Sequence, residues 1–381
     1  MAKIKVLQVN KLYYPAIGGI EKVVQHISES LKDDFSIQVL VCQPKGRKRQ
    51  EMVNGVPVYR CGSFGTLFSV PMSPAFLWQF RKMAKDQDLV QFHAPFPLGD
   101  LACLLSGYRG KVVLYWHSDV VKQKKLMLFY RPLMEAFLKR VDVIILGAQG
   151  ILEGSAYLKP YREKCVVIPF AVDPVIEERG RAYLEQRRIS GGEKQKNGPV
   201  KFLFVGRLVY YKGVDVLLKA FQQVRGGFLS IVGTGELQET LQRFVEERGL
   251  NDKVCFLGKL DDDALNKAFE DCDVFVLPSV ARSEAFGLVQ QEAMAYGKPV
   301  INTRLKSGVP EVSLDGITGL TVEPGNVSAL AEAMQKMIDY PVLRDAYGAA
   351  ARKRVEENYT TDKVTAKIKE LYESLTAAEE S

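Results

Sequence analysis

Short, nearly continuous apolar runs alternate along the chain with longer stretches in which apolar residues recur every three or four positions. Uninterrupted apolar runs of about four to eight residues are typical of parallel strands covered on both faces, so we assign these runs as strands and the longer stretches as helices. The alternation occurs twice, which predicts two doubly wound α/β domains. The assigned strands are IKVLQV, SIQVLVCQ, DLVQFH, KVVLYWH and VDVIILG in the first half, and VKFLFVG, GFLSIVG, KVCFLG, DVFVLPS and KPVINT in the second.

The division between the domains is expected after the run CVVIPFAVDP. The segment that follows, 177–198, is charged and contains glycine, and the strand pattern resumes at Val200. The chain has 381 residues, which is more than one hydrophobic core usually organises. We therefore expect an N-terminal domain over residues 1–172, a second domain over 173–358, and a C-terminal helix over 359–381 that packs back toward the first domain.

Two glutamates follow the strand DVFVLPS: Glu284 lies in a loop and Glu292 in the next helix. The backbone of Phe286, Gly287 and Leu288 stands at the start of that helix, where unpaired N–H groups and the helix dipole favour a phosphate. A glycine there lets the backbone approach a ligand closely. The Glu292 carboxylate can accept hydrogen bonds from two neighbouring hydroxyls, as on a ribose, or it simply faces solvent on an amphipathic helix.

Two cations follow the first strand of the second half. Arg207 and Lys212 lie in the turn after KFLFVG, where a guanidinium and an ammonium together can neutralise a diphosphate. Either one alone is compatible with a solvated loop cation, but both would face the Glu284 loop across the same strand ends. In the first half, Gly18 and Gly19 precede an amphipathic helix, which is a weak sign of a phosphate loop.

Two of the three histidines end strands. His93 closes DLVQFH and His117 closes KVVLYWH, and the carboxyl ends of parallel strands favour a role in a site. We expect His117 in the active cleft, leave His93 open between cleft and core, and assign His26, on a helix face, to structure. The chain has no Walker A sequence, and its nearest dinucleotide fingerprint, GTGELQ at 233–238, lacks the third glycine. These absences disfavour a P-loop NTPase and a dehydrogenase.

Taken in order, the motifs resemble those of the retaining glycosyltransferases of family four. That resemblance implies the α/β GT-B fold, in which two Rossmann-like doubly wound parallel-sheet domains face a central cleft. It runs almost end to end and is densest over residues 200–324. One departure is the segment 305–308, which lacks the double glycine that many relatives have before Pro-Glu. The matching motifs are GGIE at 18–21, HSD at 117–119, VIPFAVD, GRLVYYKGVDVLL, IVGTGEL, FLGKL and SEAFGLVQQE.

The resemblance also implies which residues bind the nucleotide-diphosphate sugar. Arg207 and Lys212 would bind the diphosphate, and Glu292 the ribose. Leu260, in FLGKL, would touch the base. The glycine pair Gly18–Gly19 would lie against the phosphates from the first domain.

Catalysis would depend on the groups around the transferred sugar. Glu284 and the backbone of 286–288 would hold that sugar, and His117 would lie near its reacting carbon. The family works with retention, usually without a metal and with no cofactor beyond the donor, and the leaving diphosphate helps to deprotonate the acceptor. The run Asp261–Asp263 is accordingly read as a helix N-cap with an acidic first turn rather than a metal site.

Finer similarity points to bacterial polysaccharide or O-antigen enzymes, a subgroup rich in mannosyltransferases that use GDP-mannose. A UDP-sugar donor stays open, because similar sequences use it. The acceptor would be a lipid-linked oligosaccharide. A non-catalytic nucleotide-sugar-binding relative is the alternative of another class, and the four intact residues Arg207, Lys212, Glu284 and Glu292 oppose it. No lysine motif for pyridoxal phosphate supports a phosphorylase, and the family-four motifs also disfavour an epimerase of this fold.

Charge is unevenly distributed. Residues 1–165 hold 24 Lys and Arg against 13 Asp and Glu, whereas the remainder holds 28 against 32. The first half is therefore expected to meet an anionic membrane surface, and nucleic acid is not expected because no motif for it is present. The basic, apolar segment 120–140 and the run KGRKR at 45–49 fit such a surface, or equally an ordinary helix pair over the sheet, with Pro132 expected to divide the segment into two helices.

The remaining signals concern the compartment. We find no signal peptide and no run of apolar residues long enough to cross a bilayer, so we expect a cytoplasmic protein, peripheral on the inner face of the cell membrane. The cysteines are widely spaced and several lie in strand-like runs, which predicts small buried hydrophobes rather than disulfides or a metal site. They are Cys42, Cys61, Cys103, Cys165, Cys255 and Cys272.

Overall fold

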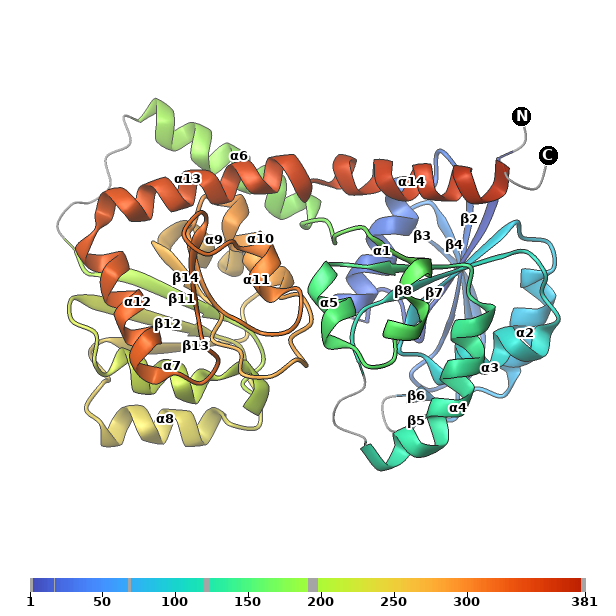
Figure 1. Cartoon of the computed structure of the whole chain (residues 1–381), viewed down its shortest axis with the longest axis horizontal. Coiled ribbons are helices and arrows are strands. Elements are labelled where there is room, and N and C mark those ends of the chain that lie inside the picture. The colour runs from blue at the N-terminus through green and yellow to red at the C-terminus, as the bar shows by residue number, and fades with distance from the viewer. Residues whose placement is uncertain (1–2, 17, 68–69, 120–123, 191–197, 378–381) are drawn as a thin grey trace. The chain divides into compact units, whose positions relative to one another are not determined.

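The chain forms two compact units (Figure 1). The N-terminal unit comprises Met1–Phe170 together with Thr361–Ser381, and the C-terminal unit comprises Ala171–Thr360. The divisions expected from the sequence, after residues 172 and 358, lie two residues from these. The computed structural model describes residues 3–16, 18–67, 70–119, 124–190 and 198–377.

The N-terminal unit is built on an eight-stranded sheet with the order β10-β9-β8-β7-β1-β2-β4-β3. All neighbouring strands are parallel except the edge strand β3, which runs antiparallel to β4. Five of these strands, β1, β2, β7, β8 and β9, are the ones assigned from apolar runs. The bounds are β1 Lys5–Val9, β2 Ser36–Cys42, β3 Arg49–Val53, β4 Val56–Cys61, β7 Leu89–Ala94, β8 Lys111–Trp116, β9 Val143–Leu146 and β10 Cys165–Val167, with a separate two-stranded hairpin of β5 Thr66–Leu67 and β6 Val70–Pro71.

The β3–β4 hairpin was not predicted, because its strands have mixed polarity. β3 is RQEMV and largely exposed, so it shows no apolar run. A local signal was nevertheless present: Asn54 and Gly55 both have positive φ, at 49° and 84°. An Asn-Gly pair in that conformation is typical of a two-residue hairpin turn.

Helices cover both faces of this sheet (Figure 1). The long terminal helix α14 packs on α1, and its Tyr372 ring meets Phe35 edge-on at 5.4 Å between centroids. His26 on α1 shares a hydrogen bond with Thr361 Oγ1 at the start of α14, in keeping with a structural role. The helices are α1 Gly19–Leu31, α2 Ala75–Ala84, α3 Pro97–Ser106, α4 Lys124–Arg140, α5 Gln149–Gly154 and α14 Thr361–Ala377, with a 3-10 turn at Lys159–Lys164.

The expected break at Pro132 is wrong, because α4 continues through this residue as one helix. Proline removes one backbone hydrogen bond from a helix interior. The packed side of α4 compensates: Met134, Phe137 and Leu138 are at most 2% exposed and hold the helix against the unit's core. The earlier part of the expected segment, residues 120–123, lies outside the described residues.

One buried acid joins α3 to α4. The Tyr130 hydroxyl of α4 donates a hydrogen bond to Asp100 Oδ2 in the first turn of α3, and Asp100 is 2% exposed. Burial raises the pKa of Asp100 to about 7, and the Tyr130 hydrogen bond opposes this rise only in part. The folded protein therefore binds this proton more tightly than the unfolded chain does.

We expect Asp100→Asn to stabilise the protein at pH 8 and to leave its stability nearly unchanged near pH 4. A raised folded pKa means that wild-type stability is lost as pH rises from about 4, the unfolded value, to the folded value near 7. Asparagine keeps an acceptor for Tyr130 and removes a loss on the order of a few kcal/mol. Urea denaturation across this pH range measures the effect, with Asp86→Asn, at an exposed position, as the control. A gain that does not grow with pH would contradict the assignment.

The C-terminal unit is built on a six-stranded parallel sheet with the order β13-β12-β11-β14-β15-β16. β11 to β15 correspond to the five assigned runs, and β16 was missed because it is short and half-buried. The bounds are β11 Val200–Val205, β12 Gly227–Val232, β13 Val254–Gly258, β14 Val274–Val276, β15 Val300–Thr303 and β16 Gly319–Val322. The two sheets and their helices confirm the predicted doubly wound α/β class.

The helices of this unit form two layers, α7, α8 and α12 in one and α6, α9, α10 and α13 in the other (Figure 1). The charged segment after the first domain begins as helix α6, and residues 191–197 of it lie outside the described part. The expected N-cap is confirmed, because the Asp261 carboxylate accepts from Ala264 N–H at the start of α9. The helices are α6 Pro174–Ile189, α7 Val214–Phe221, α8 Gln238–Glu247, α9 Asp262–Asp271, α10 Leu288–Ala295, α11 Val309–Val312, α12 Val327–Asp339 and α13 Pro341–Asn358, with a 3-10 turn at Tyr210–Lys212.

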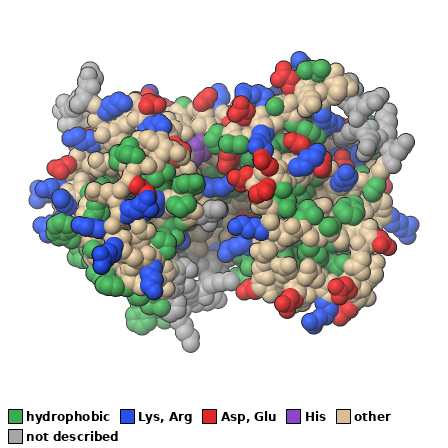
Figure 2. Space-filling view, turned by 180° about the vertical axis from the view of Figure 1, so that it is seen from behind, with side chains coloured by type: hydrophobic (Ala, Val, Ile, Leu, Met, Phe, Trp, Pro, Cys, Tyr) green, Lys and Arg blue, Asp and Glu red, His purple; other side chains and the backbone are tan. Residues whose placement is uncertain are grey.

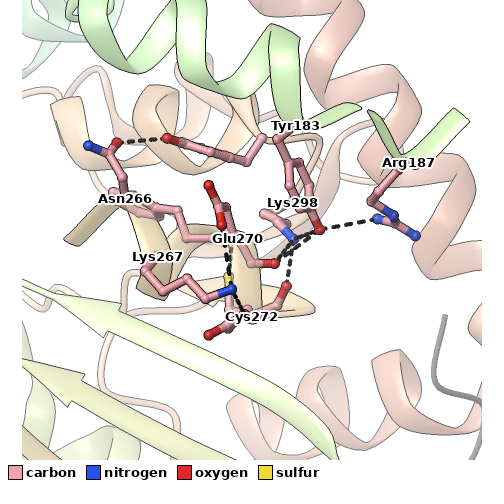
Figure 3. A network of polar contacts seen from close by, with 10 residues as sticks. Tyr183, Arg187, Asn266, Lys267, Glu270, Cys272 and Lys298 are labelled. Atoms are coloured by element: carbon pink, nitrogen blue, oxygen red, sulfur yellow. Dashed lines mark hydrogen bonds and ion pairs between the residues drawn. The ribbon is translucent and has the colours of Figure 1, made fainter. Parts of the chain in front are cut away.

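A buried lysine closes the amino-terminal edge of this sheet (Figure 3). Lys298 is 4% exposed, and its ammonium donates to Tyr183 Oη and to the carbonyls of Glu270 and Cys272 at 2.7 to 3.1 Å. The charge also lies 4.7 Å from the centroid of the Tyr183 ring. All three N–H groups are thus used within the fold. Lys298 therefore stabilises the packing of α6 and α9 against the start of β15, and it is not available to a ligand.

The six cysteines carry free thiols, and four of them are buried. The other two, Cys165 and Cys255, are half-buried. Among the described residues no helix is both long and apolar enough to cross a bilayer.

Candidate active site

In each unit most of the predicted site residues follow the two strands between which the chain reverses its direction across the sheet; His117, after β8, and Leu260, after β13, do not. In the C-terminal unit the chain runs outward from β11 through β12 and β13, then returns to β14 and runs the other way. The reversal thus lies between β11 and β14. In the N-terminal unit it lies between β1 and β7. Open α/β sheets bind ligands at the carboxyl ends of strands at this point.

The structure places Lys212 and Glu284 in direct contact at the reversal between β11 and β14. Lys212 Nζ lies 2.5 Å from Glu284 Oε2, and the two side chains are 12% and 10% exposed. Ser279 Oγ donates to the same carboxylate oxygen at 3.0 Å. The sequence assigned the lysine to a diphosphate and the glutamate to a sugar. The structure shows that the two side chains form an ion pair with each other.

Arg207 stands beside this pair with an exposed side chain. Its Nη2 donates to the Tyr211 hydroxyl at 3.0 Å, and Lys212 Nζ lies 5.8 Å from the centroid of the same ring. Tyr211 is thus placed between the two cations. Its hydroxyl contacts one cation and its ring faces the other.

Three glycines near this site are required because two segments of backbone meet at each of them. A Cβ on Gly213, where φ is +67°, would lie 2.1 Å from the Pro278 carbonyl oxygen. A Cβ on Gly233 would lie 1.9 Å from the Gly206 oxygen, and one on Gly235 would lie 2.4 Å from the Leu208 oxygen. The GTGEL motif therefore has a packing explanation: its glycines let two strand-to-helix turns touch.

The segment 286–288 forms the start of α10. Gly287 is its N-cap, with φ +74°, and Phe286 is buried against the Tyr359 ring, so the phenyl group anchors the turn. Glu292 lies half-buried in the second turn of α10. Leu260, also half-buried, follows β13 directly before the α9 N-cap.

A buried amide pair supports that turn, and the sequence analysis did not single it out. Gln290 Nε2 donates to the Phe286 and Val309 carbonyls at 3.1 and 3.3 Å, and its Oε1 accepts from Asn302 Nδ2 at 2.9 Å. Asn302 also donates to the carbonyl of Ser313. The pair ties the turn before α10 to the segment around α11. An asparagine in the otherwise apolar run PVINT was the available signal.

In the N-terminal unit, Gly18 and Gly19 stand at the start of α1. A Cβ on Gly18 would lie 2.2 Å from Glu21 Oε2, so a larger residue there would require the Glu21 side chain to move. The loop before it is held by Arg60, which is 5% exposed, pairs with Glu51 at 2.6 Å and donates to the Tyr13 and Tyr14 carbonyls. This role of Arg60 was not predicted, because a single buried arginine in β4, the strand next to the edge, produces no sequence pattern.

The structure brings His117 and His93 together. His93 Nδ1 lies 2.9 Å from His117 Nε2, and the His117 ring stacks on Phe170 at 5.3 Å. His93 is fully buried, whereas His117 is 7% exposed. Burial, aided by the Lys11 ammonium, lowers the pKa of His117 to about 3, and burial lowers the pKa of His93 well below its usual range. Both rings are therefore neutral at physiological pH.

Comparison with known proteins places this geometry in a family. A family model described as Glycosyltransferase Family 4 matches residues 17–175, and one described as Glycosyl transferases group 1 matches residues 185–354. O-antigen chain mannosyltransferase C of Escherichia coli is 33% identical over 97% of this chain and 98% of its own. The chain belongs to glycosyltransferase family four. A D-rhamnosyltransferase of Pseudomonas aeruginosa is 34% identical over 93% of this chain and 92% of its own.

Solved structures agree on the fold of this family-four glycosyltransferase. Sucrose-phosphate synthase from Thermosynechococcus elongatus superposes with a TM-score of 0.79 at 22% identity, covering 99% of this chain and all of that one. Anabaena HepE, solved in complex with UDP, gives 0.76 at 19% identity over 97% of this chain and all of its own. The predicted GT-B fold is thereby confirmed.

Proposed function

We propose that this enzyme moves a hexose, with retention of configuration, from a nucleotide-diphosphate sugar to a lipid-linked oligosaccharide. The observation that carries the proposal is the Lys212–Glu284 pair, set at the sheet reversal beside Arg207 and the start of α10. It places cationic and carboxylate groups together, as a charged sugar donor requires. The pathway we propose is bacterial polysaccharide or O-antigen synthesis, on the cytoplasmic face of the cell membrane.

The donor diphosphate would take the place of Glu284 as the partner of Lys212. Arg207 and the N–H groups at the start of α10 would bind the same phosphates, and Gly18 and Gly19 would lie against them from the other unit. Glu284, released from the lysine, would accept hydrogen bonds from the sugar hydroxyls. The charge that develops on the leaving phosphate is then the charge these donors stabilise.

The bond changes follow from that arrangement. The bond between the anomeric carbon and the phosphate oxygen breaks, and its electron pair stays on the diphosphate. The acceptor hydroxyl attacks the same face of the sugar and gives its proton to the leaving phosphate oxygen. No protein carboxylate forms a bond to the sugar, and no metal is required, in this proposal.

GDP-mannose is the donor we propose. Support comes from the mannosyltransferase of Escherichia coli and from a GDP-mannose-dependent mannosyltransferase of Corynebacterium glutamicum, which is 37% identical over 40% of this chain and 42% of its own. A UDP-sugar is the second candidate, since HepE was solved with UDP. Incubation with GDP-, UDP- and ADP-sugars, with and without lipid extract, should release GDP fastest. Release of UDP instead would show that a UDP-sugar, not GDP-mannose, is the donor. Release of no nucleotide from any of these sugars would refute the proposal.

We expect Glu292→Ala to raise the KM for the donor about 10- to 100-fold with a smaller change in kcat. Two hydrogen bonds from ribose hydroxyls to a carboxylate contribute about 1.5 to 3 kcal/mol each at most, and part of this is regained from water. Glu239→Ala, on the exposed first turn of α8, is the control. Unchanged donor affinity in Glu292→Ala would remove the ribose role.

The membrane surface we propose lies at the carboxyl edge of the N-terminal sheet. Phe129 and Leu128 on α4 are 83% and 76% exposed, and Phe64 beside the β5–β6 hairpin is 78% exposed. The basic run 45–49 is joined to this hairpin, because Gly46 and Ser63 exchange backbone hydrogen bonds. Figure 2 shows basic and apolar side chains mixed on the surface of the N-terminal unit that faces the viewer. Apolar groups ringed by cations suit a bilayer with anionic headgroups.

We expect the double substitution Leu128→Gln with Phe129→Gln to weaken binding to vesicles that contain an anionic lipid by about a hundredfold. Each buried side chain contributes about 1.5 kcal/mol or more when it leaves water. Co-sedimentation at low and high salt measures this. Val342→Gln, at an 82% exposed position of the C-terminal unit, is the matched control. An equal effect of both variants, or no binding by the wild type at low salt, would refute this surface.

A further inference from the structure

A closed network of buried polar side chains lies behind His117 in the N-terminal unit. Gln8 comes from β1, Gln91 and His93 come from β7, and Tyr372 comes from the terminal helix α14. These four side chains are 0% exposed, and the three on β1 and β7 lie in strand runs that are otherwise largely apolar. His117 is the one member that reaches the surface. A polar cluster buried this completely requires every proton to have a defined place.

The hydrogen bonds define where those protons are. Gln8 Nε2 donates to the Tyr372 hydroxyl at 2.9 Å, and that hydroxyl donates to Gln91 Oε1 at 2.6 Å. Gln8 therefore presents its carbonyl oxygen, Oε1, to His93 Nε2 at 3.0 Å. A carbonyl accepts only, so His93 carries its proton on Nε2.

The tautomer of His117 follows. A neutral imidazole has one N–H and one lone pair, so His93 Nδ1 is an acceptor. Its partner at 2.9 Å, His117 Nε2, must then be the donor. This leaves Nδ1, with its lone pair, as the ring nitrogen of His117 that can meet a ligand.

One contact favours the opposite arrangement. Gln91 Nε2 lies 3.2 Å from His93 Nε2 and can donate only to a nitrogen without a proton. Gln8 and Gln91 thus compete for the same ring nitrogen. Both glutamines also bond Tyr372, so the shorter contact to His93, which is that of Gln8, sets the tautomer.

We propose that His93 is a positioning residue that holds His117 with its proton on Nε2, so that His117 accepts a hydrogen bond from a sugar hydroxyl. The proposal rests on the proposed function, which puts His117 beside the transferred sugar. Gln8 maintains this tautomer by accepting from His93, and Tyr372 orients the Gln8 amide by accepting from it. The C-terminal helix therefore contributes directly to the chemistry of the site through Tyr372, in addition to its packing on α1.

Histidine-selective ¹⁵N NMR of the wild-type protein tests the tautomer directly, because the chain has only three histidines. We expect the coupling patterns of His93 and His117 both to report protonated Nε2 and unprotonated Nδ1. A proton on Nδ1 of His117 would overturn the proposal. This measurement needs no variant and no activity, so it separates the proposal from the proposed function.

Two matched variants test the consequence. Gln8→Met removes the acceptor, lets Gln91 donate to His93 Nε2, and should move the His117 proton to Nδ1. Gln91→Met removes the competing donor and should leave the proton on Nε2. Each variant loses one bond to Tyr372, so both should be destabilised alike. We expect Gln8→Met to lose about ten times more kcat/KM than Gln91→Met, as for one hydrogen bond to a ligand.

Equal activity losses in the two variants, with equal tautomers, would show a structural role only and overturn the proposal. An active wild-type enzyme with His117 protonated on Nδ1 would overturn it while leaving the glycosyltransferase function intact. The expected tautomers in a protein that transfers no sugar would refute the proposed function and leave the network assignment standing.

Discussion

Replacing Lys212 by methionine is expected to lower kcat/KM for sugar transfer by a factor of about 10² to 10³ and to destabilise the C-terminal unit. The activity falls because the developing charge on the leaving diphosphate loses its nearest ammonium, and one such group is typically worth that factor. The stability falls because Glu284, only 10% exposed, loses its ion-pair partner and is left with the hydrogen bond from Ser279. Removing one member of a buried ion pair costs about 3 kcal/mol.

A double substitution, Lys212→Met with Glu284→Gln, separates the two effects. It removes both charges, so stability should return to near the wild-type value while activity stays low. Urea denaturation and kcat/KM with the preferred donor are the measurements. Lys219→Met is the control, since Lys219 pairs with Asp215 in the same unit with both side chains about half exposed. Recovery of activity in the double variant would show that the ion pair is structural and that neither residue handles the donor.

The fold could be predicted where burial of an element produces a recognisable run of apolar residues along the sequence. Parallel strands covered on both faces read as apolar runs, and ten of them, from β1 to β15, were assigned on that basis. The strands missed are the exposed β3, its partner β4 with mixed polarity, the short β10 and β16, and the hairpin beside Phe64. The division of the chain near residue 170 followed from the same pattern.

The site was predictable as a set of residues but not as a set of contacts. Spacing put Lys212 and Glu284 after neighbouring strands, yet only the structure shows that they pair with each other. Gln8, Gln91 and Tyr372 are separated by up to 364 positions, and no local pattern joins them. What the sequence did contain was a polar residue inside an apolar strand run. Such a residue must find a buried partner, so it marks a network even when the partner is unknown.

The helix through Pro132 shows the limit of local rules. Proline lowers the stability of a helix interior, but tertiary packing decides whether the helix ends there. Here Phe137 and Leu138, both nearly inaccessible, continue the packed face of α4 beyond the proline. The proline alone predicted two helices. The structure has one helix there, because the buried side of the whole segment packs continuously.

Gly287→Ala is expected to reduce kcat/KM by about 10² while the protein still folds. Gly287 has φ +74°, where a side chain costs about 1 to 2 kcal/mol, and a Cβ there would lie 2.6 Å from Leu277 Cδ2 and 2.9 Å from Gln290 Nε2. Relief of that contact moves the 286–288 backbone away from the position that Gln290 fixes. Displacement of donor-binding groups by about 1 Å costs rate on this scale.

Gly325→Ala supplies the matched control, because Gly325 has φ +77° and nothing within 4 Å of an added Cβ. It imposes the same backbone strain at the loop before α12 without displacing the start of α10. We expect similar losses of stability in the two variants and loss of activity only in Gly287→Ala, measured by urea denaturation and donor kinetics. Similar activity in both variants would mean that the 286–288 backbone does not bind the donor. The cations Arg207 and Lys212 would then have to hold the diphosphate without the helix terminus.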